Sequence, residues 1–424
     1  MTSYVLDLSC INGYDMQKVF ENPNDIVSKE TLSALNIKHK KWRYNDVEYD
    51  IFRYDKGFMP RDAYSSAGVV RSVITKKGKV VCVGPPKSID MSEFTTSTNV
   101  SNVQAEEFID GVMINMFWDT DNNVWEFATR STVGGEVSFF TTNGDSKRTF
   151  RSMILDATNK ISKNWQDMLS HDTCYSFVLQ HPEHRIVARV SEPSLTLVAA
   201  YKISDGVKAT NIPLTSEFKS TFPEGIRFPL VYKTAYKMEL DSNYPYTSLR
   251  EQYASDNTDW SVVGVMFWDS STGLRAKFRN PNYESLRHLR GNQPKLQYHY
   301  LTLRKEPRCI SKYLKIWPEH RDTFAGYRDH LYQFTNSLYQ QYISTYIKKQ
   351  NILGEVPHQY RNHVYNLHAI YLEELRPNKG YIDKRRVIQY VNNLPVAQLM
   401  YSLNYHLRKQ VNAEENEKII QNAV

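Results

Sequence analysis

The sequence predicts an α+β body followed by an all-α domain. From Val47 to about Lys305, short runs rich in β-branched and aromatic residues alternate with turn signals, which is the pattern of antiparallel strands. After Pro307, apolar residues recur every three or four positions, which is the spacing of amphipathic helices. We therefore expect antiparallel sheets with some helices, and a helical domain docked directly behind them.

The length of the chain sets the number of domains. Its 424 residues are enough for two or three, because single cores stop growing near about 250 to 300 residues. We divide the chain into an N-terminal segment (1–44), a body (45–305), a helical domain (306–411) and a charged tail (412–424) that we expect to fray. One short helix is expected in the N-terminal segment over 28–35, capped by Ser28.

Turn signals divide the body into hairpins. The stretches T-K-K-G-K before Val80, D-T-D-N-N before Val124 and D-S-S-T-G before Leu274 each separate two strand-like runs. Helical spacing interrupts the strands at about 149–162 and again at 165–169.

Aromatic and aliphatic stripes define the helices of the C-terminal domain. Pro377 and Gly380 end the second of two long stripes, and Asp383 and Pro395 resemble the starts of two more helices. We interpret the stripes as the core of a helix bundle, with one face formed by Phe324, Tyr327, Leu331, Phe334, Leu338 and Tyr342 and the other by Tyr360, Val364, Leu367, Tyr371 and Leu375.

Composition excludes several classes of protein. No apolar run approaches the roughly 20 residues of a membrane span, and the first residues lack the basic and apolar regions of a signal peptide. The 4 cysteines show no C-x-x-C spacing, so neither a disulfide framework nor a thiolate metal site is predicted. We expect a soluble protein of a reducing compartment with no membrane partner.

Charge and tyrosine content bear on the binding partner. The 53 Lys and Arg against 46 Asp and Glu give a net charge of +7, which favours a polyanion such as nucleic acid without requiring one. The 29 tyrosines suit stacking on bases, and equally suit half-buried core and interface positions. We favour the packing interpretation, with RNA or a protein partner on the tyrosine-rich helices as the candidate partners.

Six segments of the body follow one another in an ordered series of motifs. This series resembles the RNA ligases of phage and giant-DNA-virus type, which belong to the covalent nucleotidyltransferase superfamily. The resemblance spans roughly residues 45–290, and the helical domain is similar to the C-terminal extension of related large-DNA-virus proteins. The six segments are 69–88 (V-V-R-S-V-I-T-K-K-G-K-V-V-C-V-G-P-P-K-S), 106–114 (E-E-F-I-D-G-V-M-I), 125–133 (W-E-F-A-T-R-S-T-V), 175–187 (Y-S-F-V-L-Q-H-P-E-H-R-I-V), 262–267 (V-V-G-V-M-F) and 275–283 (R-A-K-F-R-N-P-N-Y).

The resemblance implies a nucleotidyltransferase fold with ATP and Mg²⁺ as cofactors if ligase activity survives. It also explains why V-M-I-N-M-F-W and V-V-G-V-M-F-W are so alike. In the family these two phrases are strands that face each other across the adenylate pocket, so a similar alternation is expected in both.

The same resemblance implies that the family's chemistry is lost. Its first motif is K-x-D-G, whose lysine attacks the α-phosphate of the nucleotide, and here that position is Phe108. The glutamates of the third and fourth motifs, which serve the nucleotide and the metal, are replaced by Ser176 and Val263. We therefore predict no catalytic residue at these positions, and a lysine elsewhere, with Lys87 nearest in sequence, is the open alternative.

The motifs nevertheless retain several glycines, turn residues and basic positions. This is expected when a protein keeps its scaffold and its anion binding after catalysis is lost. Each has a structural alternative, since glycines allow close backbone approach and an aspartate can fix a turn. The candidates for contact with a nucleotide or RNA are Arg71, Lys87, Asp110, Gly111, Arg130, Arg185, Gly264, Arg275 and Lys277.

No metal site is predicted. His181 and His184 are close in sequence, but a proline lies between them and no carboxylate or cysteine stands at ligand spacing.

Three functional hypotheses follow. The first is a non-catalytic RNA ligase-like protein of a large DNA virus that binds RNA, a nucleotide or a protein partner. The second is an active ATP-dependent RNA ligase or capping-type nucleotidyltransferase with a displaced nucleophile. The third is a structural or assembly protein of the virus particle. On the viral hypotheses we expect the protein in the host cytoplasm, at the viral factory, or in the virion.

Overall fold

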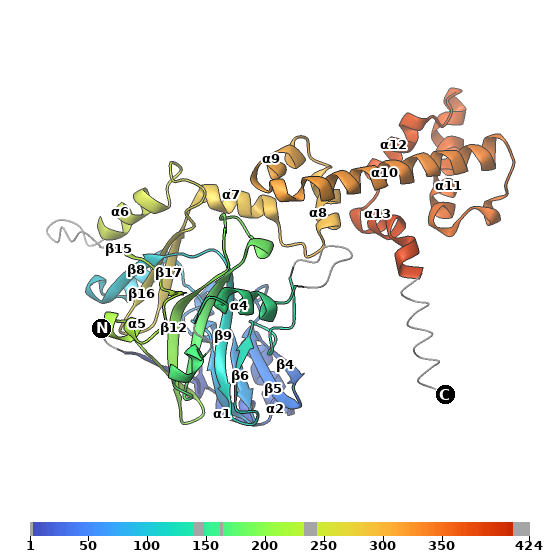
Figure 1. Cartoon of the computed structure of the whole chain (residues 1–424). Helices are drawn as coiled ribbons and strands as arrows, with labels where there is room; N and C mark the ends of the chain where they lie inside the picture. Colours follow the sequence, from blue (N-terminus) through green and yellow to red (C-terminus); the bar gives the residue numbers. More distant parts are fainter. Residues whose placement is uncertain (1–2, 140–147, 162–163, 233–243, 410–424) are drawn as a thin grey trace. The chain divides into compact units, whose positions relative to one another are not determined.

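The computed structural model describes residues 3–139, 148–161, 164–232 and 244–409. The described residues divide into two compact units, one ending at Arg290 and the other beginning at Gly291 (Figure 1). The first unit contains the sheets, which confirms the α+β prediction, and the second is helical. The domain limits at residues 44, 305 and 411 stay predictions of the sequence.

A seven-stranded sheet is the centre of the first unit. Its strands pair antiparallel except for one short parallel strand, β14, which joins β12. In spatial order the main path is β1 (Val5–Asp7), β13 (Lys208–Asn211), β12 (Ser194–Ser204), β11 (Thr173–Gln180), β9 (Val112–Asp119) and β10 (Val124–Ala128), and β14 is Ile226–Arg227.

Two four-stranded antiparallel sheets accompany the large one. The N-terminal sheet packs on it through β7, and residues such as Tyr49, Phe52 and Phe117 are buried in the shared core. The strands of the N-terminal sheet are β4 (Ile37–Tyr44), β5 (Val47–Tyr54), β6 (Val73–Lys76) and β7 (Lys79–Val83). Those of the other small sheet are β15 (Val231–Tyr232), β8 (Val103–Glu107), β16 (Gly264–Asp269) and β17 (Arg275–Arg279), and a separate ribbon is formed by β2 (Cys10–Ile11) and β3 (Tyr14–Asp15).

Helices cover and connect these sheets. The helix α4 packs on the large sheet through Met153 and Ile154, which are buried with Phe177 and Leu197 of β11 and β12. The helices of this unit are α1 (Met16–Glu21), α2 (Ile26–Ala34), α3 (Met91–Ser97), α4 (Phe150–Thr158), α5 (Ser216–Ser220), α6 (Tyr244–Tyr253) and α7 (Pro281–Arg290), and a short 3-10 turn spans Trp165–Met168.

The three predicted hairpins are confirmed as β6–β7, β9–β10 and β16–β17. In the first, Lys77 and Gly78 both have positive φ (52° and 76°), which matches the right-handed twist of the flanking strands.

Two predictions about element limits were wrong. The helix expected from Ser28 begins at Ile26, and Ser28 is buried inside it because the extended residue Asp25 precedes the first turn. Strands occupy more of the N-terminus than expected and end earlier in the body, at Arg279. Beyond that point Pro281 opens a helix, since its missing N–H is unneeded in a first turn.

The chain changes sheets between β8 and β9, at the stretch F-I-D-G (108–111). Glu107 ends a strand of the small sheet, where it pairs with Val265 of β16. Val112 begins a strand of the large sheet, where it pairs with Leu179 of β11. The two similar phrases of the sequence therefore belong to different sheets, β9 and β16.

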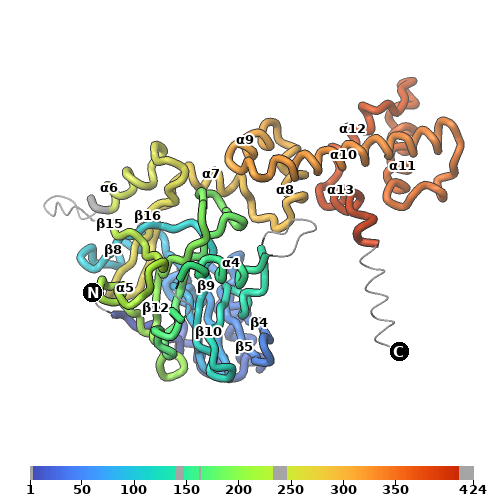
Figure 2. Tube along the Cα trace, in the orientation of Figure 1, coloured from blue at the N-terminus to red at the C-terminus, as the bar shows by residue number. Residues whose placement is uncertain are grey.

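The second unit is a set of packed helices, as the stripes predicted. Its longest described helix is α10 (Arg321–Tyr342), drawn in orange in Figure 2, which buries Phe324, Phe334, Leu338 and Tyr342. The α11 helix continues through a wider turn over Tyr371–Leu375. The other helices are α8 (Leu296–Leu303), α9 (Cys309–Ile316), α11 (His358–Ile370), α12 (Lys384–Asn393, capped by Asp383) and α13 (Val396–Leu403, preceded by Pro395).

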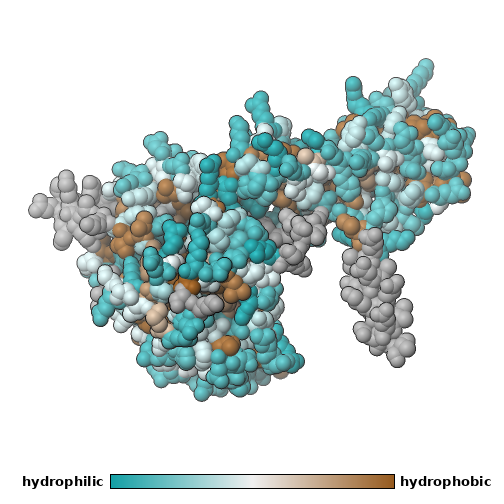
Figure 3. Space-filling model, viewed as in Figure 1, coloured by the Kyte–Doolittle hydropathy of each residue, from teal (hydrophilic) through white to brown (hydrophobic). Residues whose placement is uncertain are grey.

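Tyrosines contribute to the cores of both units. Tyr49 and Tyr201 in the first unit and Tyr313 and Tyr342 in the second are almost fully buried, in keeping with the packing interpretation. On the face that Figure 3 shows, hydrophobic residues are scattered among hydrophilic ones. Among the described residues, no helix has the length and apolar character needed to cross a membrane. The tail predicted to fray, 412–424, lies outside the described residues.

Candidate anion-binding site

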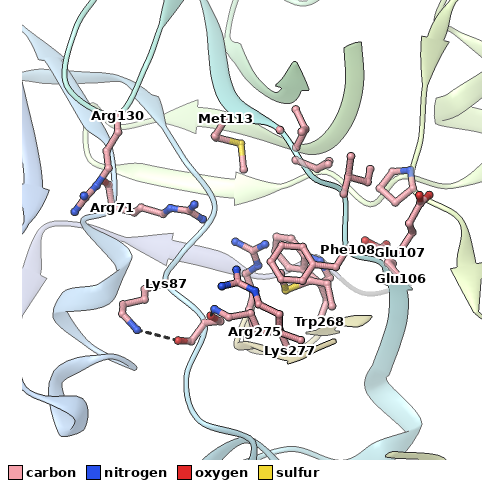
Figure 4. Close-up of a pocket in the computed structure, with 18 of the residues that line it drawn as sticks. Arg71, Lys87, Glu106, Glu107, Phe108, Met113, Arg130, Trp268, Arg275 and Lys277 are labelled. Carbon is pink, nitrogen blue, oxygen red and sulfur yellow. Dashed lines mark hydrogen bonds between the residues drawn. The ribbon is translucent and has the colours of Figure 1, made fainter. Parts of the chain in front are cut away.

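A cavity of about 420 Å³ lies within the first unit and is lined by strands of three sheets (Figure 4). The large sheet contributes β9, β11 and β12, the sheet that contains β8 contributes β8, β16 and β17, and the N-terminal sheet contributes Tyr54 at the end of β5. The side chains that line the cavity are unusually basic. Eight are cationic (Lys56, Arg71, Lys87, Arg130, Arg275, Lys277, Arg279 and Arg287) and two are acidic (Glu106 and Glu107).

Among the described residues, six of these eight cations have no acidic partner. Arg279 and Arg287 share Glu284, at 2.9 and 3.1 Å. In the part of the chain that the structure describes, no carboxylate lies within 4 Å of the charged nitrogens of the other six, which are Lys56, Arg71, Lys87, Arg130, Arg275 and Lys277. Since a buried charge is costly unless it is paired, this arrangement suits an anionic ligand.

Burial and the excess of positive charge lower the pKa values of two lysines in the cavity. Burial, followed by repulsion from Arg279 and Arg275, lowers the pKa of Lys277 to about 7. Burial also lowers the pKa of Lys87 to about 8. An anion beside these amines would favour their charged forms and raise both pKa values.

Carbonyl and hydroxyl groups hold several of the cations in place. Arg275 donates to the carbonyl of Pro86 at 3.0 Å, and Arg130 donates to the carbonyl of Tyr54 at 2.7 Å. Lys277 donates a short hydrogen bond to the Ser88 hydroxyl. These neutral acceptors fix the positions of the charged groups and leave their charge uncompensated.

All three aromatic side chains of the lining lie against guanidinium groups. The ring centroids of Trp268, Tyr54 and Phe108 are 4.1, 4.6 and 5.1 Å from the guanidinium carbons of Arg275, Arg130 and Arg279, respectively. Beside the cavity, the Lys87 amine stands 3.0 Å above the ring of Tyr64. Each contact lies within the range of a cation–π interaction, so the rings help to orient the charges.

Phe108 lies in the wall of the cavity. Its backbone N–H donates to the carbonyl of Gly264 at 3.3 Å, which ties the start of the crossing stretch to β16. The ring faces the cavity next to Arg279, and a volume of about 420 Å³ remains (Figure 4). The Phe108 ring therefore forms part of the wall and leaves the cavity open.

The structure brings together seven of the twelve predicted site positions at the cavity. Those that line the cavity are Arg71, Lys87, Phe108, Gly111, Arg130, Arg275 and Lys277. Those that do not are Asp110, Ser176, Arg185, Val263 and Gly264.

Asp110 and Arg185 have structural roles. One Asp110 carboxylate oxygen accepts from the N–H groups of Val187 and Ala188, at 3.0 and 2.9 Å, and the other accepts from the Tyr283 hydroxyl at 2.7 Å. Arg185 donates to the carbonyls of the same two residues, Val187 and Ala188. Asp110 therefore acts as a clamp between the crossing stretch, the loop after β11 and α7.

Ser176 lies on the cavity face of the large sheet, one residue pair beyond the cavity. It pairs with Asn115 across the β11–β9 ladder and donates to the Asn115 side chain at 2.8 Å. The next pair on the same face, Val178 and Met113, lines the cavity. The residue of β11 that lines the cavity is therefore Val178, and its side chain is apolar.

The two retained glycines of the motifs permit close packing. A Cβ on Gly264 would lie 2.1 Å from the Phe278 carbonyl oxygen, and one on Gly111 would lie 2.5 Å from that of Leu179. Val263 is buried beside Gly264, outside the cavity lining.

The prediction missed Lys56, Arg279 and Arg287, and the acidic pair Glu106 and Glu107. Arg279 could have been found, because Arg275, Lys277 and Arg279 alternate along one strand and therefore share a face. Lys56 and Arg287 carry no such signal, since their place at the cavity depends on distant loops and on α7.

The carboxylates do not form a metal site. Burial raises the pKa of Glu106 to about 7, against the attraction of Arg275, and the Gln104 side chain donates to its carboxylate at 2.7 Å. Among the described residues, no three His, Cys, Asp or Glu side chains converge as metal ligands. A resident Mg²⁺ fits poorly beside eight cations, because a divalent metal requires several hard oxygen donors.

Comparison with known proteins finds similarity at the level of structure. No protein-family model matches the chain, and no curated protein sequence does. Solved structures with similarity include a protein of Aquifex aeolicus described as an ATP-dependent DNA ligase, with 16% identity over 82% of this chain and 80% of that one and a TM-score of 0.39. An archaeal ATP-dependent RNA ligase shows 11% identity over 94% and 81%, with a TM-score of 0.39. A Naegleria gruberi RNA ligase mutant solved with ATP and Mn shows 11% over 68% and 86%, with a TM-score of 0.33.

The neighbours are thus ATP-dependent RNA and DNA ligases. The identities are low and the TM-scores are below 0.5, so this similarity carries no argument about function. The function of the protein is therefore inferred from the residues of the cavity.

Proposed function

We propose that the protein binds the phosphates of a nucleotide in the cationic cavity and does not form a covalent nucleotide adduct. The observation that carries the proposal is the set of six cavity cations that have no carboxylate within 4 Å among the described residues. Arginine and lysine at such a density suit phosphate oxygens, which accept several charge-assisted hydrogen bonds at once.

The absence of covalent chemistry is argued from Phe108. In the ligases that the motif series resembles, a lysine at this position attacks the α-phosphate, and a phenyl ring has no lone pair to supply. Val178, the residue of β11 that lines the cavity, likewise supplies no carboxylate for a metal, and Val263 lies outside the lining. We therefore propose a ligase-like scaffold that has kept phosphate binding after losing nucleotidyl transfer.

Two measurements on the full chain test this proposal. Equilibrium dialysis with radiolabelled ATP or GTP should show binding that weakens as salt rises, because charged contacts are screened. Denaturing gels after incubation with α-labelled nucleotide and Mg²⁺ should show no labelled protein. Failure to bind any nucleotide at low salt would overturn the proposal.

The variants Lys56→Ala and Arg287→Ala probe the rim of the cavity, where side chains are partly exposed and folding is least disturbed. Each should weaken nucleotide binding. Lys41→Ala is the matched control, because Lys41 is an exposed lysine of the same unit and does not line the cavity.

A displaced nucleophile is the second candidate, and Lys277 favours it. Its pKa of about 7 leaves a substantial neutral fraction at physiological pH, and it lines the cavity. In that reaction the amine would attack the α-phosphorus, a P–N bond would form, pyrophosphate would leave with the P–O electron pair, and the amine proton would pass to solvent. A labelled band that Lys277→Met abolishes and Lys87→Met retains would establish this alternative.

RNA is a further source of the same phosphate chemistry. An RNA with a 5′-phosphate should bind more tightly than the same RNA with a 5′-hydroxyl if the cavity holds the terminal phosphate. Lys56, Arg71 and Arg287 would then contribute to the dependence of binding on salt.

A role in a large DNA virus, with the protein in the host cytoplasm or the virion, is proposed from the motif resemblance alone. On the assembly hypothesis, the partner surface lies on the helical unit, where Tyr332, Tyr365 and Tyr381 are exposed. Incorporation into particles together with a lack of affinity for nucleotide and RNA would favour that hypothesis over phosphate binding.

A further inference from the structure

The uncharged polar groups of the cavity are few. Among the described lining residues no Asn, Gln or Thr is present, and the single serine, Ser88, already accepts from Lys277. The carbonyls of Tyr54, Pro86 and Ser88 accept from Arg130, Arg275 and Lys87, respectively. A base is distinguished by paired donors and acceptors along its edge, and these four acceptors already serve the cavity's own cations.

The aromatic side chains of the lining also contact the cavity's own cations. Tyr54, Phe108 and Trp268 each have a guanidinium group within 6 Å of the ring centroid. A ring that already holds a cation offers less free surface for stacking on a base. The rings therefore serve to present Arg130, Arg279 and Arg275 to the ligand.

The number of cations sets the size of the anion. A phosphomonoester carries about two negative charges at pH 7, which would leave most of the six unpaired cations uncompensated. A chain of three phosphates supplies more charge and more acceptor oxygens within a small volume. In Figure 4, Arg71, Arg130 and Lys87 lie on the side of the cavity opposite to Glu106 and Glu107, so the phosphates are expected toward the first group.

From these observations we infer that the cavity recognises a triphosphate chain and is largely indifferent to the base attached to it. The inference rests on the proposed function and deepens it, since it names the part of the nucleotide that is read. ATP, GTP, CTP and UTP should bind alike, and inorganic tripolyphosphate should compete with all of them.

The test is a competition series on the full-length protein. Labelled ATP is displaced by the other three nucleoside triphosphates, tripolyphosphate, AMP and adenosine at one low salt concentration. The four triphosphates and tripolyphosphate are expected within about threefold of one another, and AMP at least about tenfold weaker. Adenosine should not compete.

The outcomes separate this inference from the proposed function. If AMP competes as well as ATP, or if ATP binds and tripolyphosphate does not, the base or sugar is read and the inference is wrong, while nucleotide binding stands. If ATP itself does not bind, the proposed function fails first. An RNA oligonucleotide with a 5′-triphosphate should also compete, and equal competition by its 5′-hydroxyl form would contradict the inference.

A pair of variants adds a readout that loss of folding would not imitate. Lys56→Ala and Arg287→Ala should weaken tripolyphosphate and ATP by similar factors and should affect AMP less. The control Lys41→Ala should change none of these affinities. An equal loss for all ligands in the rim variants would argue against a phosphate-chain site.

Discussion

The guanidinium carbon of Arg279 lies 5.1 Å from the centre of the Phe108 ring. Phe108, at the position where the motif resemblance implies a lysine, therefore contacts a cation of the cavity lining. The same guanidinium also contacts Glu284 at 2.9 Å, so Arg279 is held from two sides.

Replacing Phe108 by leucine should weaken binding of nucleoside triphosphates without unfolding the protein. The cation–π contact contributes about 0.5–1 kcal/mol at exposed sites, so a decrease in affinity of about twofold to fivefold is expected. Phe108→Tyr keeps the ring and should bind as the wild type does. Dialysis with labelled ATP measures both, and an increase in affinity in Phe108→Leu would show that the ring obstructs the ligand.

Nucleotide affinity should fall as pH rises from about 7 to 9. The folded-state pKa values of Lys277 and Lys87, about 7 and 8, lie below the ordinary lysine value, so both amines lose their protons over this range. An anion favours the protonated amines, and binding should therefore take up protons. Calorimetry in buffers of different ionisation enthalpy measures the uptake, and Lys277→Met should flatten the profile; an unchanged profile would contradict the assignment.

The same groups make the ligand-free protein more stable at higher pH. Because their pKa values are depressed in the folded state, the unfolded chain binds more protons between about pH 7 and 10.5, and stability rises with pH across that range. Urea unfolding at a series of pH values checks the sign. Lys277→Met should reduce the slope, and an increased slope in that variant would be inconsistent with this account.

Asp110→Ala should destabilise the first unit rather than abolish ligand contact. The carboxylate accepts three hydrogen bonds, and removal of such a partner costs about 1–3 kcal/mol for each buried donor left unsatisfied. Thermal unfolding should shift to lower temperature, with nucleotide still bound well below the transition. A variant that keeps its stability and loses binding would place Asp110 in contact with the ligand.

Gly264→Ala should be strongly destabilising, because its Cβ would lie 2.1 Å from a backbone oxygen at a φ of +137°. A cost of more than about 2 kcal/mol is expected from the strain and the clash together. Gly326→Ala in α10 is the control, since its Cβ meets no atom within 4 Å and alanine favours a helix by about 1 kcal/mol. Urea denaturation compares the two, and equal stabilities would contradict the packing described for β16.

Much of the fold could be predicted from local sequence, because its turns and helix faces are formed by residues close together in the chain. The turn at Lys77 and Gly78 and the stripe from Phe324 to Tyr342 involve neighbours in sequence, where propensity and periodicity act directly. The start of α2 was misplaced because Ser28 resembles a cap in isolation. Its burial inside the helix depends on tertiary packing, which local pattern does not report.

The cavity was predicted in part. Arg275 and Lys277 were found because they belong to a strand motif, whereas Lys56 and Arg287 reach the site through long-range folding. Ser176, a position of the motif series, lies on the same face of β11 as Val178, which lines the cavity. Two positions along a strand separate residues by roughly 6–7 Å, a distance that a motif match alone does not resolve.

The unpaired cations of the cavity would link the stability of the protein in a cell to its ligand. The cavity joins segments as distant in sequence as Tyr54 and Arg287, so it exists only when the first unit is fully folded. A ligand bound there stabilises the folded state by RT ln(1 + [L]/Kd), which is about 2.7 kcal/mol at a hundredfold excess over Kd. The abundance of the protein would then follow the local concentration of triphosphates, and depletion of that pool would expose the chain to unfolding and degradation.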